Sequence, residues 1–464
     1  DFPYPLVYSF THFFHIIDFM KKHLFSNKDL AYLLIPLILE QLLTSLMGTI
    51  DTIMVSNVGS AAISAVSLVD SINILVLMAM TAMATGGAIV CSQYIGNEDY
   101  KNANNAARQI IFCVTIVSLS LMAFCLLFRK PLLQLIFGKV EASVMEGAMT
   151  YFFYTAISFP FIGLYNAGAS IFRSQRNTKL PLIVSVLSNI MNIVGNYILI
   201  FIVHMGVAGA AIATLLSRIF LAIVILYYLR KENQIISVRN YLQIRPNGDL
   251  IRRILKLGIP SGIENSMFQF GKLCIQSTVS TLGTVAIAAQ AMTNILENLN
   301  GIAGLSVGMG MMTVIGQCLG AGRKEEAKYY MRKMTIIAEF TIIFSCLGVY
   351  LATPYITAFA GMEYRSAKMC EEMILAITIV KPLVWTLAFV PSYGMRAAGD
   401  AKFTMTVSII TMWSCRVLLC ILLCRFLGFG PMGVWIAMFT DWTIRTIVFF
   451  IRLKSEKWLN HKVI

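Results

Sequence analysis

The sequence predicts an all-α integral membrane protein with twelve transmembrane helices in two six-helix bundles. Of its 464 residues, 58% are hydrophobic and only 13% are charged, whereas about 25% are charged in a soluble domain. Twelve apolar runs are each long enough to cross a bilayer core, which takes about 20 residues. The second half of the chain also repeats the first. These three observations define the predicted fold class.

The apolar runs divide evenly between the halves. Six lie near residues 31–56, 66–92, 107–128, 148–172, 180–203 and 206–229, and six near 254–280, 286–315, 333–353, 370–395, 403–424 and 431–453. Because each half has an even number of spans, both halves enter the membrane from the same side. We therefore expect a pseudo-two-fold axis along the membrane normal, with a central cleft between the bundles.

Basic residues fix the expected orientation. With both termini in the cytoplasm, the cytoplasmic segments hold 26 of the 37 Lys and Arg residues, the outer loops hold six, and five fall within spans. This bias is what the positive-inside rule requires. The compact loops favour a prokaryotic inner (plasma) membrane, crossed many times.

The repeat keeps one offset over most of the chain. Residues 224 positions apart match at many points: Pro36 with Pro260, Glu40 with Glu264, "VSNVGSAAISA" (55–65) with "VSTLGTVAIAA" (279–289), "QYIG" (93–96) with "QCLG" (317–320), and "GVAGAAIA" (206–213) with "GPMGVWIA" (430–437). Arg173 and Lys179 match Arg396 and Lys402 one residue out of step. Coincidence would not preserve one offset over that distance.

The predicted organisation has five parts. They are an N-terminal interfacial segment (1–30), an N-lobe of six spans (31–229), a cytoplasmic linker (230–253), a C-lobe of six spans (254–455) and a cytoplasmic tail (456–464). The first segment is aromatic and apolar, which fits an amphipathic interfacial helix; an artefact of the start site is the alternative. The basic linker is predicted to be a solvated loop, so no nucleic-acid partner is expected.

No catalytic signature is present. Ten cysteines lie mostly in apolar runs, without CxxC or zinc spacing, and no HExxH, GxSxG or Walker-type loop occurs. The sequence predicts neither an enzyme nor a bound cofactor. A channel has no support either, because no selectivity-filter repeat appears.

Three stretches resemble the multidrug and toxic compound extrusion (MATE) family of cation-coupled antiporters. They are "IPLILEQLLTSLMGTIDTIMVSNVGSAAISAVS" (35–67), "GVAGAAIAT" (206–214) and "GQCLGAGRKEEA" (316–327). The resemblance covers about residues 31–455. It implies two bundles around a V-shaped cleft, and export of cationic or amphipathic drug-like compounds driven by Na⁺ or H⁺. We expect a monomer in the bilayer.

Asp51, in "GTIDTIMVS" (48–56), is the main candidate for ion coupling. A charge at the bilayer centre costs roughly 3 kcal/mol or more, so ionisable residues there are functional candidates. A desolvated carboxyl group can hold a proton, and with oxygen neighbours it can hold Na⁺. The resemblance places the family's N-lobe coupling carboxylate here. The alternative is a carboxylate that only bonds neighbouring helices.

Asn192, Asn196 and Thr214 resemble the rest of the family's N-lobe polar cluster. The two asparagines are four residues apart, so they share a helix face. Many family members carry a second Asp where this chain has Asn196, which leaves one carboxylate and weakens any mechanism that needs a proton shared by a pair. Interhelical hydrogen bonding is the alternative role.

Five further residues are candidates for the substrate cleft. Glu40 and Glu264 are related by the repeat, and either share a structural role near the cytoplasmic side or act in gating and substrate contact. Asp70 and Glu297 each lie three residues from an Asn, so each half has one acid and one amide that line the cleft or join helices. Lys381 precedes a proline within a span.

The C-lobe differs from the family pattern. By alignment, the family's tenth-span Asp falls near Trp385, which cannot coordinate a cation, so a C-lobe cation site is not expected. Arg218 and Arg445 are expected to pair with acids, and three other bases lie in the C-lobe spans: Lys272, Lys381 and Arg416. They either pair with Glu264, Glu297 or Asp441 or bind an anionic group. The second alternative is why a lipid-linked glycan flippase of the related superfamily remains the competing function.

Overall fold

The computed structural model describes residues 23–138, 140–239, 241 and 244–464. The predicted interfacial helix therefore lies largely outside the described residues. The first lobe consists of α2 (Asn27–Ser56), α3 (Ser60–Gly96), α4 (Tyr100–Leu127), the short α5 (Arg129–Phe137), α6 (Ala142–Ile157), α7 (Phe159–Ser174), α8 (Lys179–Asn196) with a π-helical end (Tyr197–Ile202), and α9 (Gly206–Leu229).

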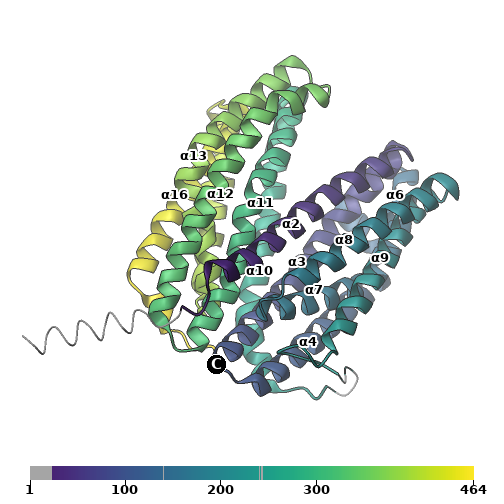
Figure 1. Cartoon of the computed structure of the whole chain (residues 1–464). Helices are drawn as coiled ribbons and strands as arrows, with labels where there is room; N and C mark the ends of the chain where they lie inside the picture. The colour runs from purple at the N-terminus through teal and green to yellow at the C-terminus, as the bar shows by residue number, and fades with distance from the viewer. Residues whose placement is uncertain (1–22, 139, 240, 242–243) are drawn as a thin grey trace, which may run out of the picture.

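The second lobe repeats the order of six spans. It consists of α10 (Gly248–Val279), a 3₁₀ turn (Ser280–Leu282), α11 (Thr284–Gly320), α12 (Lys324–Phe359), α13 (Tyr364–Ala397), a broken helix made of α14 (Ala401–Thr411), π turns (Met412–Leu418 and Leu422–Phe426) and α15 (Leu419–Ile421), then α16 (Gly430–Lys454) and a 3₁₀ turn (Lys457–Asn460). Figure 1 shows the two groups of helices as separate lobes.

The predicted twelve-span, two-bundle architecture is confirmed. Among the described residues, ten helices are long and apolar enough to cross a membrane, and α6 with α7 makes an eleventh span bent by 44°. The twelfth, α10, has the required length but contains Glu264 and Lys272 and is more polar. It begins at Gly248, inside the predicted linker.

Sequence signals explain where equivalent helices begin. At α2, the Ser26 hydroxyl accepts a hydrogen bond from the Asp29 amide (3.1 Å), and the Asp29 carboxylate accepts one from the Ser26 amide (2.8 Å). This capping box satisfies two otherwise free donors. Gly59 and Gly283 precede α3 and α11 with φ of 131° and 90°, a conformation that favours glycine. The repeated "VSxxG" motif thus turns the chain between the first two helices of each lobe.

Two helices hold the lobes together in a symmetric arrangement. α2 packs on α8 of its own lobe and on α11 of the other, while α10 packs on α14 of its own lobe and on α3 of the other. Glycines permit both contacts. A Cβ on Gly86 would lie 2.7 Å from the Gly258 amide nitrogen, and one on Gly310, its repeat equivalent, would lie 2.6 Å from the Leu34 side chain.

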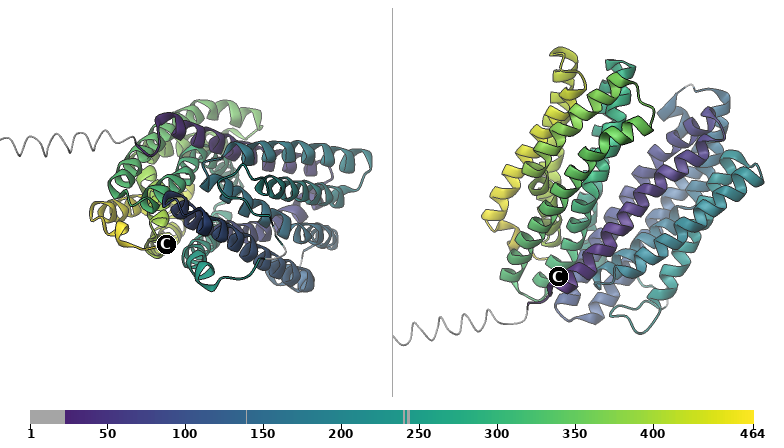
Figure 2. Two further views of the ribbon diagram at one scale, coloured as in Figure 1. Left: turned by 60° about the horizontal axis from the view of Figure 1, so that its bottom comes forward. Right: turned by 45° about the horizontal axis from the view of Figure 1, so that its top comes forward.

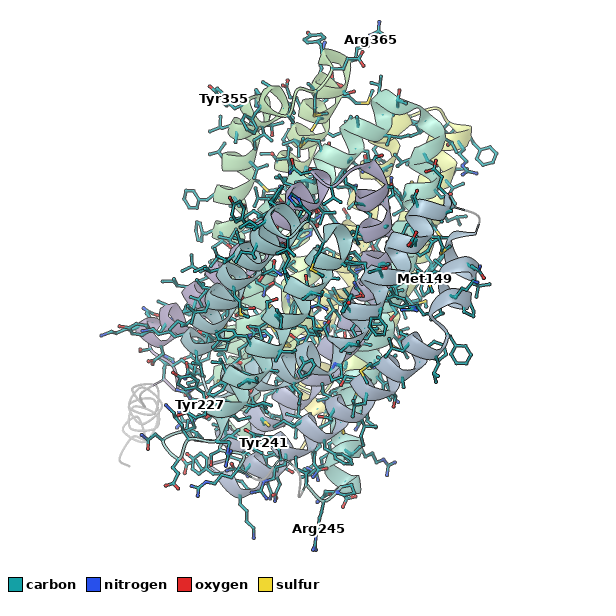
Figure 3. All side chains as sticks on the ribbon, turned by 90° about the vertical axis from the view of Figure 1, so that its right-hand side faces the viewer. Met149, Tyr227, Tyr241, Arg245, Tyr355 and Arg365 are labelled. Atoms are coloured by element: carbon teal, nitrogen blue, oxygen red, sulfur yellow. The ribbon has the colours of Figure 1, made fainter. Side chains whose placement is uncertain are left out.

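Figures 1 and 2 both show that the lobes converge at one end and diverge at the other. The C-terminus lies at the converging end. Figure 3 shows Arg245 of the linker at one end of the molecule and Arg365, in a predicted outer loop, at the opposite end. The linker also packs against the N-lobe. The backbone amides of Ile236 and Ser237 donate to Gln175 Oε1 (3.0 Å) and Asn104 Oδ1 (2.8 Å), and the Ile236 side chain is fully buried.

Candidate ion and substrate site

The four residues predicted for ion coupling lie together inside the N-lobe. The Asn196 amide on α8 donates to Asp51 Oδ1 on α2 (2.8 Å) and to Asn192 Oδ1 (3.2 Å). Asn192 in turn donates to Thr214 Oγ1 (3.4 Å) and Ser217 Oγ (3.5 Å) on α9. One network therefore joins α2, α8 and α9. Its assembly is observed, and its role in ion coupling remains a prediction.

This cluster offers oxygen atoms to a small cation. Asn196 is 1% exposed, and its Oδ1 is buried without a hydrogen-bond partner. Among the described residues, no three His, Cys, Asp or Glu side chains gather as they would around a transition metal. One carboxylate with amide and hydroxyl oxygens is instead a donor set suited to a hard cation such as Na⁺. The carboxylate alone suffices for a proton.

Two further charged groups, Asp70 and Arg218, lie beside the cluster. Asp70 on α3 accepts hydrogen bonds from the Asn73 amide (3.1 Å) and the Tyr151 hydroxyl (3.5 Å). The charges of Asp70 and Arg218 both act on Asp51. Asp70, predicted to line the cleft, is therefore also electrostatically coupled to the ion candidate. An ionisable residue within the sixth span was the visible signal for Arg218, whereas nothing in the sequence singled out Tyr151.

Glu40 and Glu264 form equivalent ion pairs within their own lobes. Arg173 on α7 donates to Glu40 Oε1 on α2 (2.7 Å), and Arg396 on α13 donates to Glu264 Oε1 on α10 (3.1 Å). The Tyr165 hydroxyl adds a bond to Glu40 (3.2 Å). Both glutamates are buried, at 4% and 8% exposed. Each pair ties the first helix of a lobe to its fourth span.

Lys381 and Glu297 are joined directly. Lys381 Nζ lies 2.6 Å from Glu297 Oε1, also contacts Asn300 Oδ1, and lies 4.8 Å from the centre of the Trp385 ring. Lys381 is fully buried. Ion pairing is thus what the structure shows for this base. Deeper in the lobe, Asp441 pairs with Arg416 and with Arg445, each at 2.8 Å.

A cavity lies between the lobes. Its volume is about 470 Å³, and Ser71, Ile74 and Leu75 of α3 form one side while the C-lobe forms the rest. Glu297 lines this cavity. The other four predicted cleft residues do not: Glu40, Asp70, Glu264 and Lys381.

The converging end is closed by a symmetric pair of glutamines. Gln93 of α3 donates to the Ala397 carbonyl of the C-lobe (2.8 Å), and Gln317 of α11 donates to the Ser174 carbonyl of the N-lobe (2.7 Å). Arg176 donates to Gln317 Oε1 (2.7 Å). Gln93 and Gln317 are the first residues of the repeated "QYIG" and "QCLG" motifs. The two motifs meet across the interface between the lobes. We call the interlobe hydrogen bonds of Gln93 and Gln317 the glutamine clasp.

These features define the class of protein. Two repeat-related bundles of membrane-spanning helices, closed at one end, with buried ionisable groups and a cavity between them, make a membrane transporter. The MatE family model matches residues 36–198 and 260–422, which is well over half of the chain and one match per lobe. The chain belongs to the MatE family, the multidrug and toxic compound extrusion transporters.

Individual relatives extend over nearly the whole chain. The chain is 26% identical over 457 residues to the uncharacterized transporter YisQ of Bacillus subtilis, covering 95% of this chain and 97% of YisQ. It is 25% identical over 448 residues to the probable multidrug resistance protein NorM of Thermotoga maritima, covering 94% of each. A structure described as the outward-facing conformation of a multidrug resistance MATE family transporter superposes with a TM-score of 0.86 at 20% identity, covering 92% of this chain and 95% of the other.

Proposed function

We propose that this protein is an antiporter that exports cationic or amphipathic organic compounds in exchange for inward-moving Na⁺ or H⁺. It acts as a monomer in a prokaryotic cell membrane, with both termini in the cytoplasm. The observation that carries the proposal is the buried network of Asp51, Asn192, Asn196 and Thr214. It places one carboxylate among neutral oxygen atoms within membrane-spanning helices.

The network supports coupling because it spans three helices. A bound cation draws the oxygen atoms of α2, α8 and α9 together, and its loss leaves Asp51 with the hydrogen bond from the Asn196 amide. Since α2 also packs on α11 of the C-lobe, a change at Asp51 reaches the interface between lobes. An ion shifts this equilibrium only by its different affinity for the two conformations.

The shape of the molecule supports alternating access. The lobes diverge at the end opposite the linker (Figure 2), and the glutamine clasp closes the other end. With the linker in the cytoplasm, this conformation faces outward. Opening toward the cytoplasm requires the clasp to separate. The family match and the relatives named for multidrug resistance do not favour the glycan flippase.

The test is dye efflux from proteoliposomes with Na⁺ and H⁺ gradients imposed separately. One of the two gradients should drive efflux by the wild type. The variant Asp51→Asn keeps the shape of the side chain and removes its charge, so we expect gradient-driven efflux to fall at least about tenfold. The matched control is Glu146→Gln, which removes an exposed acid elsewhere in the N-lobe and should transport normally. Wild-type efflux by Asp51→Asn would refute the coupling role.

A further inference from the structure

The cavity between the lobes has the size and lining of a ligand site. Its volume of about 470 Å³ falls within the range of about 300–1,000 Å³ typical of small-molecule sites. Four aromatic side chains contribute to the wall, together with amides and charged groups. The aromatic residues are Phe268, Trp385, Phe389 and Trp442.

The charged groups around this cavity do not balance. Four basic side chains lie in and behind its wall: Lys272, Lys381, Arg416 and Arg445. The acids that face them are Glu297, which Lys381 binds at 2.6 Å, and Asp441, which both arginines bind at 2.8 Å. A further C-lobe acid, Glu339 on α12, does not line the cavity.

The surplus positive charge lies on the cavity wall itself. Lys272 is exposed there and has no ion pair among the described residues. Arg416 also lines the cavity, is only 3% exposed, and its Nε is buried without a hydrogen-bond partner. Both cations flank one ring: Lys272 Nζ lies 5.5 Å and the Arg416 guanidinium 4.9 Å from the centre of Phe268.

The N-lobe has the opposite charge balance. Beside Asp51, the ion candidate, lie a second acid, Asp70, and the base Arg218. The internal repeat shows how the sequences of the two lobes differ at this site. At the offset of 224 residues, Asp51 corresponds to Ile275 and Asn192 corresponds to Arg416. The C-lobe therefore carries a fixed cation on the helix equivalent to α8, the N-lobe helix that bears Asn192 and Asn196.

Such an excess of charge is unfavourable without a ligand. An uncompensated charge within the membrane is unfavourable, and Asp441, which two arginines share, cannot neutralise both of them. The arrangement is suited to a group that brings negative charge. A guanidinium with a free Nε next to a lysine can hold a carboxylate or sulfonate through charge-assisted hydrogen bonds.

We propose that this cavity binds the anionic group of an aromatic amphipathic compound. Lys272 and Arg416 hold the anionic group, and the aromatic body packs on Phe268 and its aromatic neighbours. This inference rests on the proposed export function and narrows its substrates to amphipathic compounds that carry a carboxylate or sulfonate. The N-lobe ion site remains separate, because none of its residues lines the cavity.

Equilibrium binding of two dyes of similar shape and opposite charge tests the inference. Fluorescein is anionic and rhodamine 123 is cationic, and both share a three-ring body. Fluorescence anisotropy is measured on the purified full-length protein in nanodiscs, without any ion gradient. This test therefore separates substrate preference from ion coupling. The efflux result for Asp51→Asn does not change the dye-binding result, and a negative dye-binding result does not argue against antiport.

We expect fluorescein to bind at least about tenfold more tightly than rhodamine 123. Lys272→Gln should weaken fluorescein binding by about tenfold without weakening rhodamine 123 binding, and Lys272→Arg should restore it. Lys272 forms no ion pair with the residues that the structure describes, so these variants should fold, which thermal melting checks. Lys402→Gln, which removes an exposed lysine outside the cavity, should bind as the wild type does.

Three results with these dyes and Lys272→Gln would overturn the inference. They are equal or tighter binding of rhodamine 123, absence of saturable fluorescein binding, and fluorescein affinity unchanged in a folded Lys272→Gln protein. Weakened binding in Lys402→Gln of the same size as in Lys272→Gln would also overturn it, because the effect would then reflect net charge alone.

Discussion

Replacing Gly320 by alanine should force the converging end of the lobes apart. A Cβ at Gly320 would lie 1.9 Å from the carbonyl oxygen of Gln93, across the interface, and one at its repeat equivalent Gly96 would lie 2.1 Å from the carbonyl oxygen of Gln317. Both obstacles are backbone atoms, which cannot rotate away as a side chain can. Gly320→Ala is therefore a direct perturbation of the glutamine clasp.

The size of the effect follows from the geometry. Carbon–oxygen contacts begin at about 3.3 Å, so the two backbones must separate by roughly 1.4 Å. The clasp hydrogen bonds, from Gln93 (2.8 Å) and Gln317 (2.7 Å), would then exceed hydrogen-bonding distance. Each contributes about 1 kcal/mol. Loss of both, about 2 kcal/mol, changes the equilibrium between closed and open clasp by about 30-fold.

Double electron–electron resonance measures the separation. Spin labels at Lys101→Cys and Arg332→Cys, exposed on α4 and α12, report the distance between lobes near the clasp. All ten cysteines lie in described residues, and eight are buried. The other two, Cys274 and Cys415, are replaced by serine so that only the introduced sites react.

We expect Gly320→Ala to move the distance distribution to longer values and to slow transport. Gly348→Ala is the matched control, because a Cβ there has no neighbour within 4 Å. A distribution in Gly320→Ala that coincides with that of the control would show that the clasp does not determine the separation of the lobes.

Two further predictions concern the buried ion pairs. Lys381→Met leaves the Glu297 carboxylate without its 2.6 Å partner, which should destabilise the protein by about 3–5 kcal/mol and lower its melting temperature. Adding Glu297→Gln to this variant should restore much of the lost stability. No recovery in the double variant would contradict the pairing. Glu40→Gln and Glu264→Gln break equivalent ion pairs, and each should lower the melting temperature. The decrease should be somewhat larger for Glu40→Gln, because its ion pair is shorter. A variant that keeps wild-type stability but loses dye binding would assign that glutamate to substrate contact instead.

The architecture was predictable because it depends on patterns the sequence carries directly. Apolar length, the bias of basic residues and a constant offset of 224 residues are each local or periodic signals. The assembly of Asp51 with Asn192 and Asn196 was also foreseeable. The two asparagines share a helix face by spacing, and the resemblance to the family placed the helix beside Asp51.

Contacts between distant helices were not predictable in the same way. Nothing local in the sequence shows that Arg173 reaches Glu40 or that the Tyr151 hydroxyl reaches Asp70. Such partners are set by helix packing and by the bend between α6 and α7. The π-helical turns, including the one that contains Arg416, likewise have no sequence signature, although they decide where this guanidinium points.

The central claim is that ion binding at Asp51 and substrate binding are coupled. The most direct measurement is the affinity of the purified protein for a transported dye as Na⁺ concentration and pH are varied independently, in the wild type and in Asp51→Asn. Because linkage is reciprocal, we predict that one of the two ions weakens dye binding at least about tenfold in the wild type, and that this dependence disappears in the variant. An ion dependence that is absent from the wild type, or that persists unchanged in Asp51→Asn, would contradict the account.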